Sequence, residues 1–429
     1  MRRFLHSLEI YADFDFITYF ITLKRDKRQQ QDITNVLKKD YKGKKFNNSF
    51  EENVYCTVFH EVTHFLDLTT TVWGLEYSYR KLRVIKNNFD PNILDVFKLN
   101  VAEIEIFNDN KFSWRREIDF NNCVLTHSPV YTENWGAFIV VNIFKDFIDR
   151  YNYNLIAQIP INMLTVLETN AVATEYLIKL KHSISFPNEI EKEFDNFIND
   201  PRYIEYNILL LLLRRGFNFL TLEKLLIFTK YLIKISLNLD MFSLSSLANI
   251  IEKTFENKII GNTIGMELRR GMSRDILVFK LILIFHSMIE NDKHLKKELS
   301  QNPKNFLYKF LLSDNEQTLI DFSINSAFKM INEDTLNIFN YKLIEQSFLN
   351  NYPLLQNNIE TDYLLKDFAL PDILLEDQET IVTPPNRINF NIIDFFNNNF
   401  DDIYTLNQAL KKDIYKFHMD PIAANNRVF

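Results

Sequence analysis

Glycine is scarce in this sequence, with only 7 among 429 residues. Ordinary usage would give roughly 30 glycines in a chain of this length. No two glycines are spaced as G-x-G, and none precedes a Lys-Ser or Lys-Thr pair. The sequence therefore lacks the dinucleotide-binding and P-loop fingerprints, in which glycine lets the backbone approach a phosphate. The scarcity also disfavours sandwiches and barrels with many tight turns, because primed turns use glycine.

Cysteine, net positive charge and long apolar runs are also in short supply. Two cysteines, Cys56 and Cys123, cannot build a disulfide framework, which favours a reducing compartment. A net charge of -7 disfavours a general nucleic-acid binder. No uncharged apolar segment reaches about 18 residues, and Glu9 and Asp13 interrupt any signal-like start. We therefore expect a cytoplasmic protein with neither a membrane nor a nucleic-acid partner.

Helical periodicity is what the sequence has in abundance. Apolar residues recur at three- and four-residue spacing over 50–70 and 161–182, and in a series of segments from residue 201 onward. Pro160 and Asn162 mark the start of the second of these helices. Alternating residues over 8–23 predict a strand, with further extended pieces at 101–107 and 123–141. The fold class is therefore mainly α (α+β).

Two segments carry charge of opposite sign. Residues 24–45 hold nine Lys or Arg against three Asp, and residues 357–402 hold ten Asp or Glu against two Lys or Arg. The basic segment is interpreted as a solvated surface, with docking of an acidic partner as the alternative. The acidic segment is interpreted as a connection or tail that drapes over the body. Contact between the two is less expected than exposure of both to water.

One motif carries chemistry: His60-Glu61-Val62-Thr63-His64, an H-E-x-x-H pattern inside a predicted helix. His60 and His64 lie four residues apart, so both imidazoles project from one face and can bind one metal ion. Glu61 lies about 100° round the helix and can accept a proton from a metal-bound water without being a ligand. Zinc lowers the pKa of such a water to about 7. The sequence thus predicts a hydrolytic zinc site.

A catalytic zinc needs a third protein ligand. In the extended pattern H-E-x-x-H-x-x-G-x-x-H a later histidine supplies it, but Leu66 and Thr70 occupy the corresponding positions here. The best candidate segment is 167–175, on the helix predicted at 161–182. A glutamate there reaches the metal if the two helices pack antiparallel, and the small residues after Glu168 allow a close approach.

At these residues the sequence resembles the gluzincin class of zinc metallopeptidases, which pair H-E-x-x-H with a downstream helix carrying a liganding Glu. The resemblance implies His60, His64 and Glu168 as zinc ligands and Glu61 as general base. Alternatives for the third ligand are Glu175, Glu76, Glu103 and Glu133.

Further residues are assigned supporting roles. Asp67 lies on the same stripe as both histidines and is expected to orient a ligand imidazole, and Glu175 is expected to accept a hydrogen bond from one. The developing oxyanion needs a donor, for which His127 and Tyr131 are preferred over Tyr176 and His182. An extended segment, 101–107 or 124–131, could pair with the substrate backbone.

We therefore expect a zinc-dependent endopeptidase that cleaves a restricted intracellular protein substrate, with a regulatory or defence role. The expected organisation is a zincin-like domain with a small N-terminal sheet at 1–185, a helical substrate-selection domain at 186–345 and an acidic segment at 346–429. Two alternatives stay open: a zinc hydrolase acting on a non-peptide amide or ester, and a non-enzymatic helical interaction protein.

Overall fold

The computed structural model describes two compact units, each assembled from separate stretches of the chain. The first comprises residues 1–93, 170–191 and 318–412, and the second 94–169, 192–317 and 413–429. The domain boundaries predicted at 185 and 345 would divide the chain into three successive segments, whereas each of these units combines separate stretches. Those boundaries remain predictions. The residues whose structure is described are 11–16, 18–86, 120, 123–132, 136–145, 154–312, 321–329, 341–356, 358–391 and 426–427. Most of them are helical, as the periodicity predicted.

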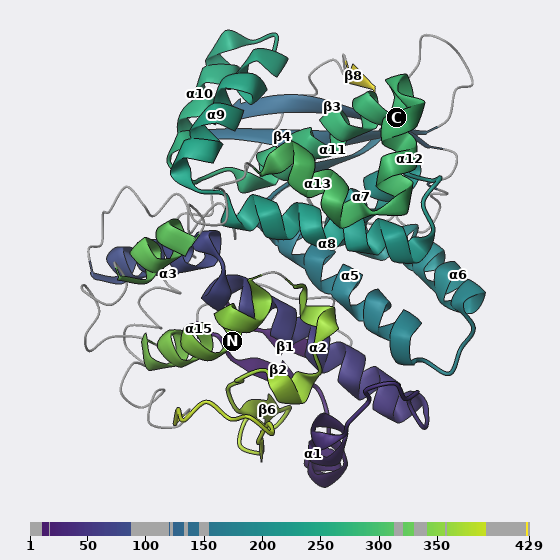
Figure 1. Cartoon of the computed structure of the whole chain (residues 1–429), viewed down its shortest axis with the longest axis vertical. Coiled ribbons are helices and arrows are strands. Elements are labelled where there is room, and N and C mark those ends of the chain that lie inside the picture. The colour runs from purple at the N-terminus through teal and green to yellow at the C-terminus, as the bar shows by residue number, and fades with distance from the viewer. Residues whose placement is uncertain are drawn as a thin grey trace. The chain divides into compact units, whose positions relative to one another are not determined.

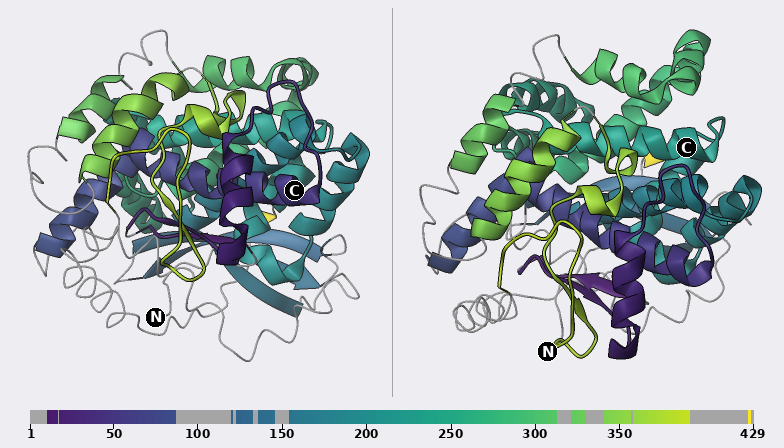
Figure 2. Two further views of the ribbon diagram at one scale, coloured as in Figure 1. Left: turned by 90° about the horizontal axis from the view of Figure 1, so that it is seen from below. Right: turned by 60° about the horizontal axis from the view of Figure 1, so that its bottom comes forward.

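The first unit contains a small mixed sheet in the order β1-β2-β6-β7. Strands β1 (Ala12–Phe14) and β2 (Ile21–Leu23) form an antiparallel pair, and β2 runs parallel to β6 (Ile373–Leu375), which pairs with β7 (Ile381–Val382). Figure 2 shows purple β1 and β2 beside the yellow-green segment that carries β6. The single strand predicted over 8–23 is instead two short strands. Between them Tyr19 adopts a left-handed φ of 63° that reverses the chain.

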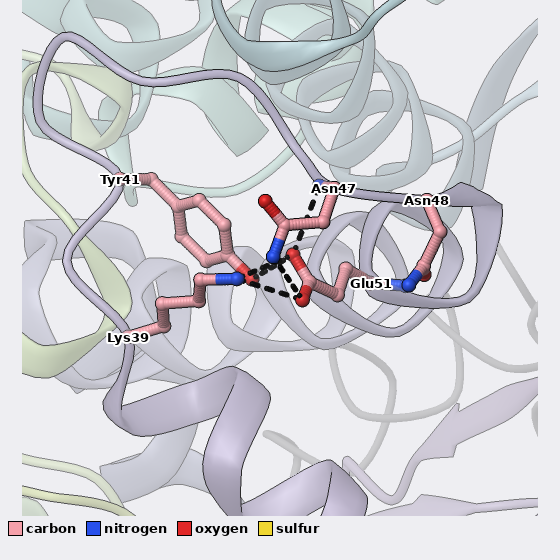
Figure 3. A network of polar contacts seen from close by, with 5 residues as sticks. All are labelled: Lys39, Tyr41, Asn47, Asn48 and Glu51. Carbon is pink, nitrogen blue, oxygen red and sulfur yellow. Dashed lines mark hydrogen bonds and ion pairs between the residues drawn. The ribbon is translucent and has the colours of Figure 1, made fainter.

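Helix α2 (Ser49–Thr70) is the centre of the first unit. Its start is fixed by Asn48, whose side chain accepts the backbone N–H of Glu51 at 2.9 Å. The Glu51 carboxylate in turn accepts from Lys39, Tyr41 and Asn47 (Figure 3). This network ties the basic segment, with helix α1 (Gln30–Lys38), to the first turn of α2.

Helix α3 (Val72–Lys86) follows α2 after a single residue, Thr71. The Thr71 hydroxyl donates to the Asp67 carbonyl at 2.5 Å and accepts from the Gly74 N–H at 3.0 Å. A Cβ built on Gly74 would lie 2.2 Å from the Asp67 carbonyl oxygen. One of the rare glycines is therefore required where the two helices meet.

The acidic segment packs on the first unit. Its residues 358–391 contain η6 (Glu360–Asp362), η7 (Leu365–Asp367) and the strands β6 and β7. Lys366 forms an ion pair with Asp40 at 2.8 Å, and Gln30 donates to the Ile381 carbonyl at 2.6 Å. The acidic and basic segments therefore do touch, although exposure of both to water was the expected arrangement. In their ion pair the lysine belongs to the acidic segment and the aspartate to the basic segment.

Helix α15 (Tyr341–Leu355) also belongs to this unit and packs on α2. The Thr69 and Ser347 hydroxyls are hydrogen-bonded at 2.7 Å, and the Asn351 amide bonds the backbone of Ala369 in both directions at 2.8 Å. These buried contacts hold the acidic segment against the end of α2.

The second unit contains an antiparallel sheet in the order β5-β4-β3-β8. Its strands are β3 (Cys123–Thr132), β4 (Gly136–Lys145), β5 (Asn154–Ile161) and β8 (Asn426–Arg427). From residue 201 onward helices follow one another, as predicted in general terms, although α10, α12 and α13 were not predicted individually. They are α7 (Ile204–Gly216), α8 (Leu222–Asn238), α9 (Met241–Ile251), α10 (Lys258–Arg269), α11 (Arg274–Asn291), α12 (Lys293–Gln301) and α13 (Pro303–Leu311) (Figure 1).

Two helices run from one unit into the other along the chain, α5 (Met163–His182) and α6 (Pro187–Ile198). Helix α5 matches the predicted helix, and Asn162 caps it by accepting the Thr165 N–H at 2.8 Å. Within the described part of the chain, the longest apolar helices fall short of what a membrane crossing requires.

Candidate metal centre

The two histidines and the glutamate of the H-E-x-x-H motif lie in the middle of helix α2, and all three side chains are buried. The imidazole rings of His60 and His64 lie with their centroids 5.1 Å apart and their planes 81° apart. His60 is 7% exposed, Glu61 3% and His64 0%. One turn of helix therefore aligns two nitrogen ligands, with a carboxylate beside them, away from bulk water.

Helix α5 packs antiparallel to α2, as the third-ligand argument required (Figure 1). Three contacts within the first unit fix the alignment from one end to the other. Ser183 donates to Glu52 at 2.8 Å, Glu175 lies 3.6 Å from His60, and Asn170 donates to Asp67 at 2.9 Å. Residue numbers rise along α2 while they fall along α5, which defines the antiparallel direction.

Glu168 precedes Asn170 by two residues on the same continuous helix and is fully buried. His60, His64 and Glu168 each offer one ligand atom, and these atoms all lie within 4.8 Å of one another. The structure thus brings together the three residues that the sequence singled out as ligands. This buried group could hold a metal ion.

The chemistry of the donors fits zinc. Two imidazole nitrogens and one carboxylate oxygen form the ligand set of one class of catalytic zinc, which keeps the fourth position for water or substrate. A hard cation such as Mg²⁺ or Ca²⁺ prefers oxygen ligands alone and suits this set less well.

Glu175 lies beside the group, with its carboxylate 3.6 Å from His60 Nδ1. Lys179 forms an ion pair with it at 2.9 Å. Burial alone would raise the pKa of Glu175, but Lys179 and His60 outweigh it and lower that pKa to about 2. The carboxylate is therefore charged and lies on the Nδ1 side of the His60 ring, where a charged group can orient an imidazole. Glu175 thus lies beside His60, and its predicted supporting role remains a prediction. The ion pair of Glu175 with Lys179 was not predicted.

Asp67 makes a contact that the sequence analysis missed. Both of its carboxylate oxygens accept from the Asn170 amide nitrogen at 2.9 Å, and both residues are buried. Its predicted role in orienting a ligand imidazole remains a prediction. The observed contact joins α2 to α5 close to Glu168. Asn170 belongs to the segment 167–175 that was proposed to carry the third ligand. Its partner Asp67 could be identified only from the antiparallel packing of α5 on α2.

The β1–β2 hairpin lies against His64. The rings of Phe14 and Phe16 lie 6.0 and 5.5 Å from the His64 imidazole, centroid to centroid. Alternation along the chain could place these rings on a strand but could not indicate which helix they would meet. Their apolar contact restricts the orientation of His64.

The predicted oxyanion donors lie on strand β3. His127 is buried with its ring centroid 5.3 Å from that of Phe279 on α11, and burial, aided by Lys280, lowers its pKa to about 4. Tyr131 belongs to the same strand, but its side chain is outside the described ones. The donor role of both residues remains a prediction. Of the two candidate substrate-pairing segments, 124–131 is within β3 and 101–107 lies outside the described residues.

The other residues considered have different surroundings. His182 is hydrogen-bonded through Nδ1 to the Lys44 carbonyl at 2.9 Å, and Tyr176 lies beneath the Lys179 ammonium at 4.7 Å. Glu76 is on α3, 4.0 Å from Arg80. Glu103 and Glu133 lie outside the described residues.

No protein-family model matches the sequence, and no curated protein or solved structure matches it either.

Proposed function

We propose that this chain is a zinc-dependent endopeptidase of the gluzincin type. The observation that carries the proposal is the buried His60–His64–Glu168 group, whose ligand atoms lie within 4.8 Å of one another. Chance can place H-E-x-x-H in a sequence, but it does not place a carboxylate from residue 168 against both histidines. The donor set and the adjacent Glu61 are those of zinc hydrolases.

The roles of the residues follow from their chemistry. His60, His64 and Glu168 would hold the ion, which when bound polarises a carbonyl and acidifies a water. Glu61 would accept a proton from the attacking water and deliver it to the leaving amine, as a general base and then a general acid. Glu175 holds the ring of His60 in the orientation that turns Nε2 away from it. The helices within 186–345 are proposed to select the substrate.

One observation favours a second candidate, hydrolysis of a small non-peptide amide or ester. All four residues of the centre are less than one-tenth exposed. A small substrate enters such a site more easily than a folded polypeptide does. The residue roles are the same in both cases, so the two candidates differ only in what they cleave.

The test compares purified full-length wild type with Glu61→Gln. Mass-spectrometric metal analysis should find about one zinc per chain in both proteins, because Glu61 is not a ligand. A proteome-derived peptide library should be cut by the wild type alone, with a loss of at least a hundredfold in the variant. Zinc without any peptide cleavage would favour the small-substrate hydrolase. A wild type without stoichiometric metal would refute both candidates.

A further inference from the structure

Two loops of the first unit lie side by side and are exposed together. The Phe46 N–H donates to the His182 carbonyl at 2.7 Å, and the His182 Nδ1 is hydrogen-bonded to the Lys44 carbonyl at 2.9 Å. Residues 42–45 and 184–186, which flank these contacts, are all exposed. We call these two stretches the paired loops.

The first of the paired loops carries surplus positive charge. Lys42, Lys44 and Lys45 are exposed, and the described residues provide neither an ion pair within 4.0 Å nor a hydrogen bond to any of their three ammonium groups. Two cations elsewhere in the basic segment have acidic partners, since Lys39 meets Glu51 at 2.7 Å and Arg28 meets Asp26 at 2.8 Å. Three lysines within four residues of one another therefore give this loop a local excess of positive charge.

The second of the paired loops carries two exposed apolar side chains. Ile184 is 61% exposed and Phe186 is 74% exposed. The loop itself is held firmly, because the Ser183 hydroxyl donates to Glu52 at 2.8 Å and the Phe186 N–H donates to Glu189 at 3.0 Å. These contacts hold the backbone at both ends of the short stretch that presents Ile184 and Phe186 to solvent.

The lysine loop is anchored at both ends and projects between them. Tyr41 and Asn47 both donate to the Glu51 carboxylate, and Figure 3 shows the chain arching from one to the other. At Gly43, where φ is 68°, a Cβ would meet nothing within 4 Å. The paired loops thus form a fixed, projecting tip with apolar and cationic side chains together.

We propose that the paired loops dock the protein on an anionic membrane surface. Phe186 and Ile184 would enter the boundary between headgroups and acyl chains, while the three lysines meet lipid phosphates and carboxylates. A projecting tip suits a bilayer better than it suits a peptide, which binds in a groove or adds to a sheet edge. This contact needs no spanning helix and revises the expectation that no membrane is a partner. It does not depend on the metal centre.

The test is sedimentation of the full chain with vesicles of phosphatidylcholine, with and without one third phosphatidylserine. Binding should require phosphatidylserine and should weaken at high salt, because the attraction of lysines to anionic lipid is screened. Replacing Lys42, Lys44 and Lys45 together by Gln should weaken binding about 100-fold, at about fivefold for each lysine. Ile184→Ser with Phe186→Ser should weaken it at least tenfold, roughly as expected for partial burial of two such side chains.

Matched controls separate docking from general stickiness. Phe242 on α9 is 73% exposed, so Phe242→Ser removes an equally exposed ring elsewhere. Lys293→Gln with Lys297→Gln removes exposed charge from α12. Both controls should bind vesicles like the wild type, and circular dichroism should be the same for all variants. Equal losses in controls and loop variants would overturn the proposal. So would binding to polyglutamate but not to phosphatidylserine vesicles, which would identify an acidic protein as the partner.

Discussion

The Asn170 amide nitrogen lies 2.9 Å from both carboxylate oxygens of Asp67, across 103 residues of sequence and inside the protein. This contact sets the position of α5 along α2. Glu168 precedes Asn170 by two residues, and His64 precedes Asp67 by three. The same contact that joins the helices therefore determines where the proposed third ligand stands relative to the histidines.

Asn170→Ala should lower both stability and metal affinity. It removes a donor from a buried carboxylate, which costs about 3 kcal/mol in the free energy of unfolding. It also frees α5 to shift, so we expect zinc affinity to fall at least tenfold in the protein that remains folded. Urea unfolding and zinc titration against a competing chelator measure the two effects.

Asn351→Ala is the matched control for that variant. Asn351 is also buried, and it ties α15 to Ala369 by hydrogen bonds of 2.8 Å. It should destabilise the protein to a similar degree and leave zinc affinity unchanged. If both variants lose zinc equally, the effect of Asn170 is general destabilisation and its positioning role is wrong.

Glu168 and Glu175 should respond differently to removal of their charge. Glu168→Gln should abolish stoichiometric zinc binding, because the proposed site then keeps only two strong ligands. Glu175→Gln should retain zinc with affinity lowered about 10- to 100-fold, as expected for a group that only orients a ligand. Equilibrium dialysis with zinc distinguishes them, and the reverse order of affinities would make Glu175 the ligand.

The sequence predicted the parts of this site that lie within one helix and left open those that depend on packing. Four-residue spacing sufficed to align His60 with His64. Glu168 could be proposed because a helix follows Asn162, but only the alignment of α5 with α2 brings it to the histidines. Phe14 and Phe16 approach His64 because the chain reverses at Tyr19, which the alternating pattern of 8–23 concealed. The sequence also could not predict which segments form each of the two units, because each unit combines stretches that lie far apart in the chain.

Stability should fall as the pH drops from about 6.5 to about 4 because of His127. Burial, with the nearby Lys280, lowers the pKa of this imidazole from 6.5 to about 4. Between those values the unfolded chain binds a proton that the folded protein does not, so acid favours unfolding, by up to about 3 kcal/mol. Urea unfolding at a series of pH values should show this slope in the wild type and a flatter one in His127→Gln. A constant slope in His127→Gln would show that this imidazole is not the cause.

Gly74→Ala should be among the most damaging single-methyl additions in the first unit. The new Cβ would lie 2.2 Å from the Asp67 carbonyl oxygen and 2.5 Å from the Leu68 Cα. Both are backbone atoms of α2, so the two helices must separate, at a cost of about 3 kcal/mol or more in the free energy of unfolding. Since the Asp67 carboxylate also accepts a hydrogen bond from the Asn170 amide, zinc affinity should fall together with stability.

Gly43→Ala is the control, because its cost arises only from the left-handed φ of 68° and the new methyl meets nothing within 4 Å. We expect about 1 kcal/mol there, with zinc affinity unchanged. Equal costs for the two glycines in urea unfolding would mean that α3 does not need its close approach to α2.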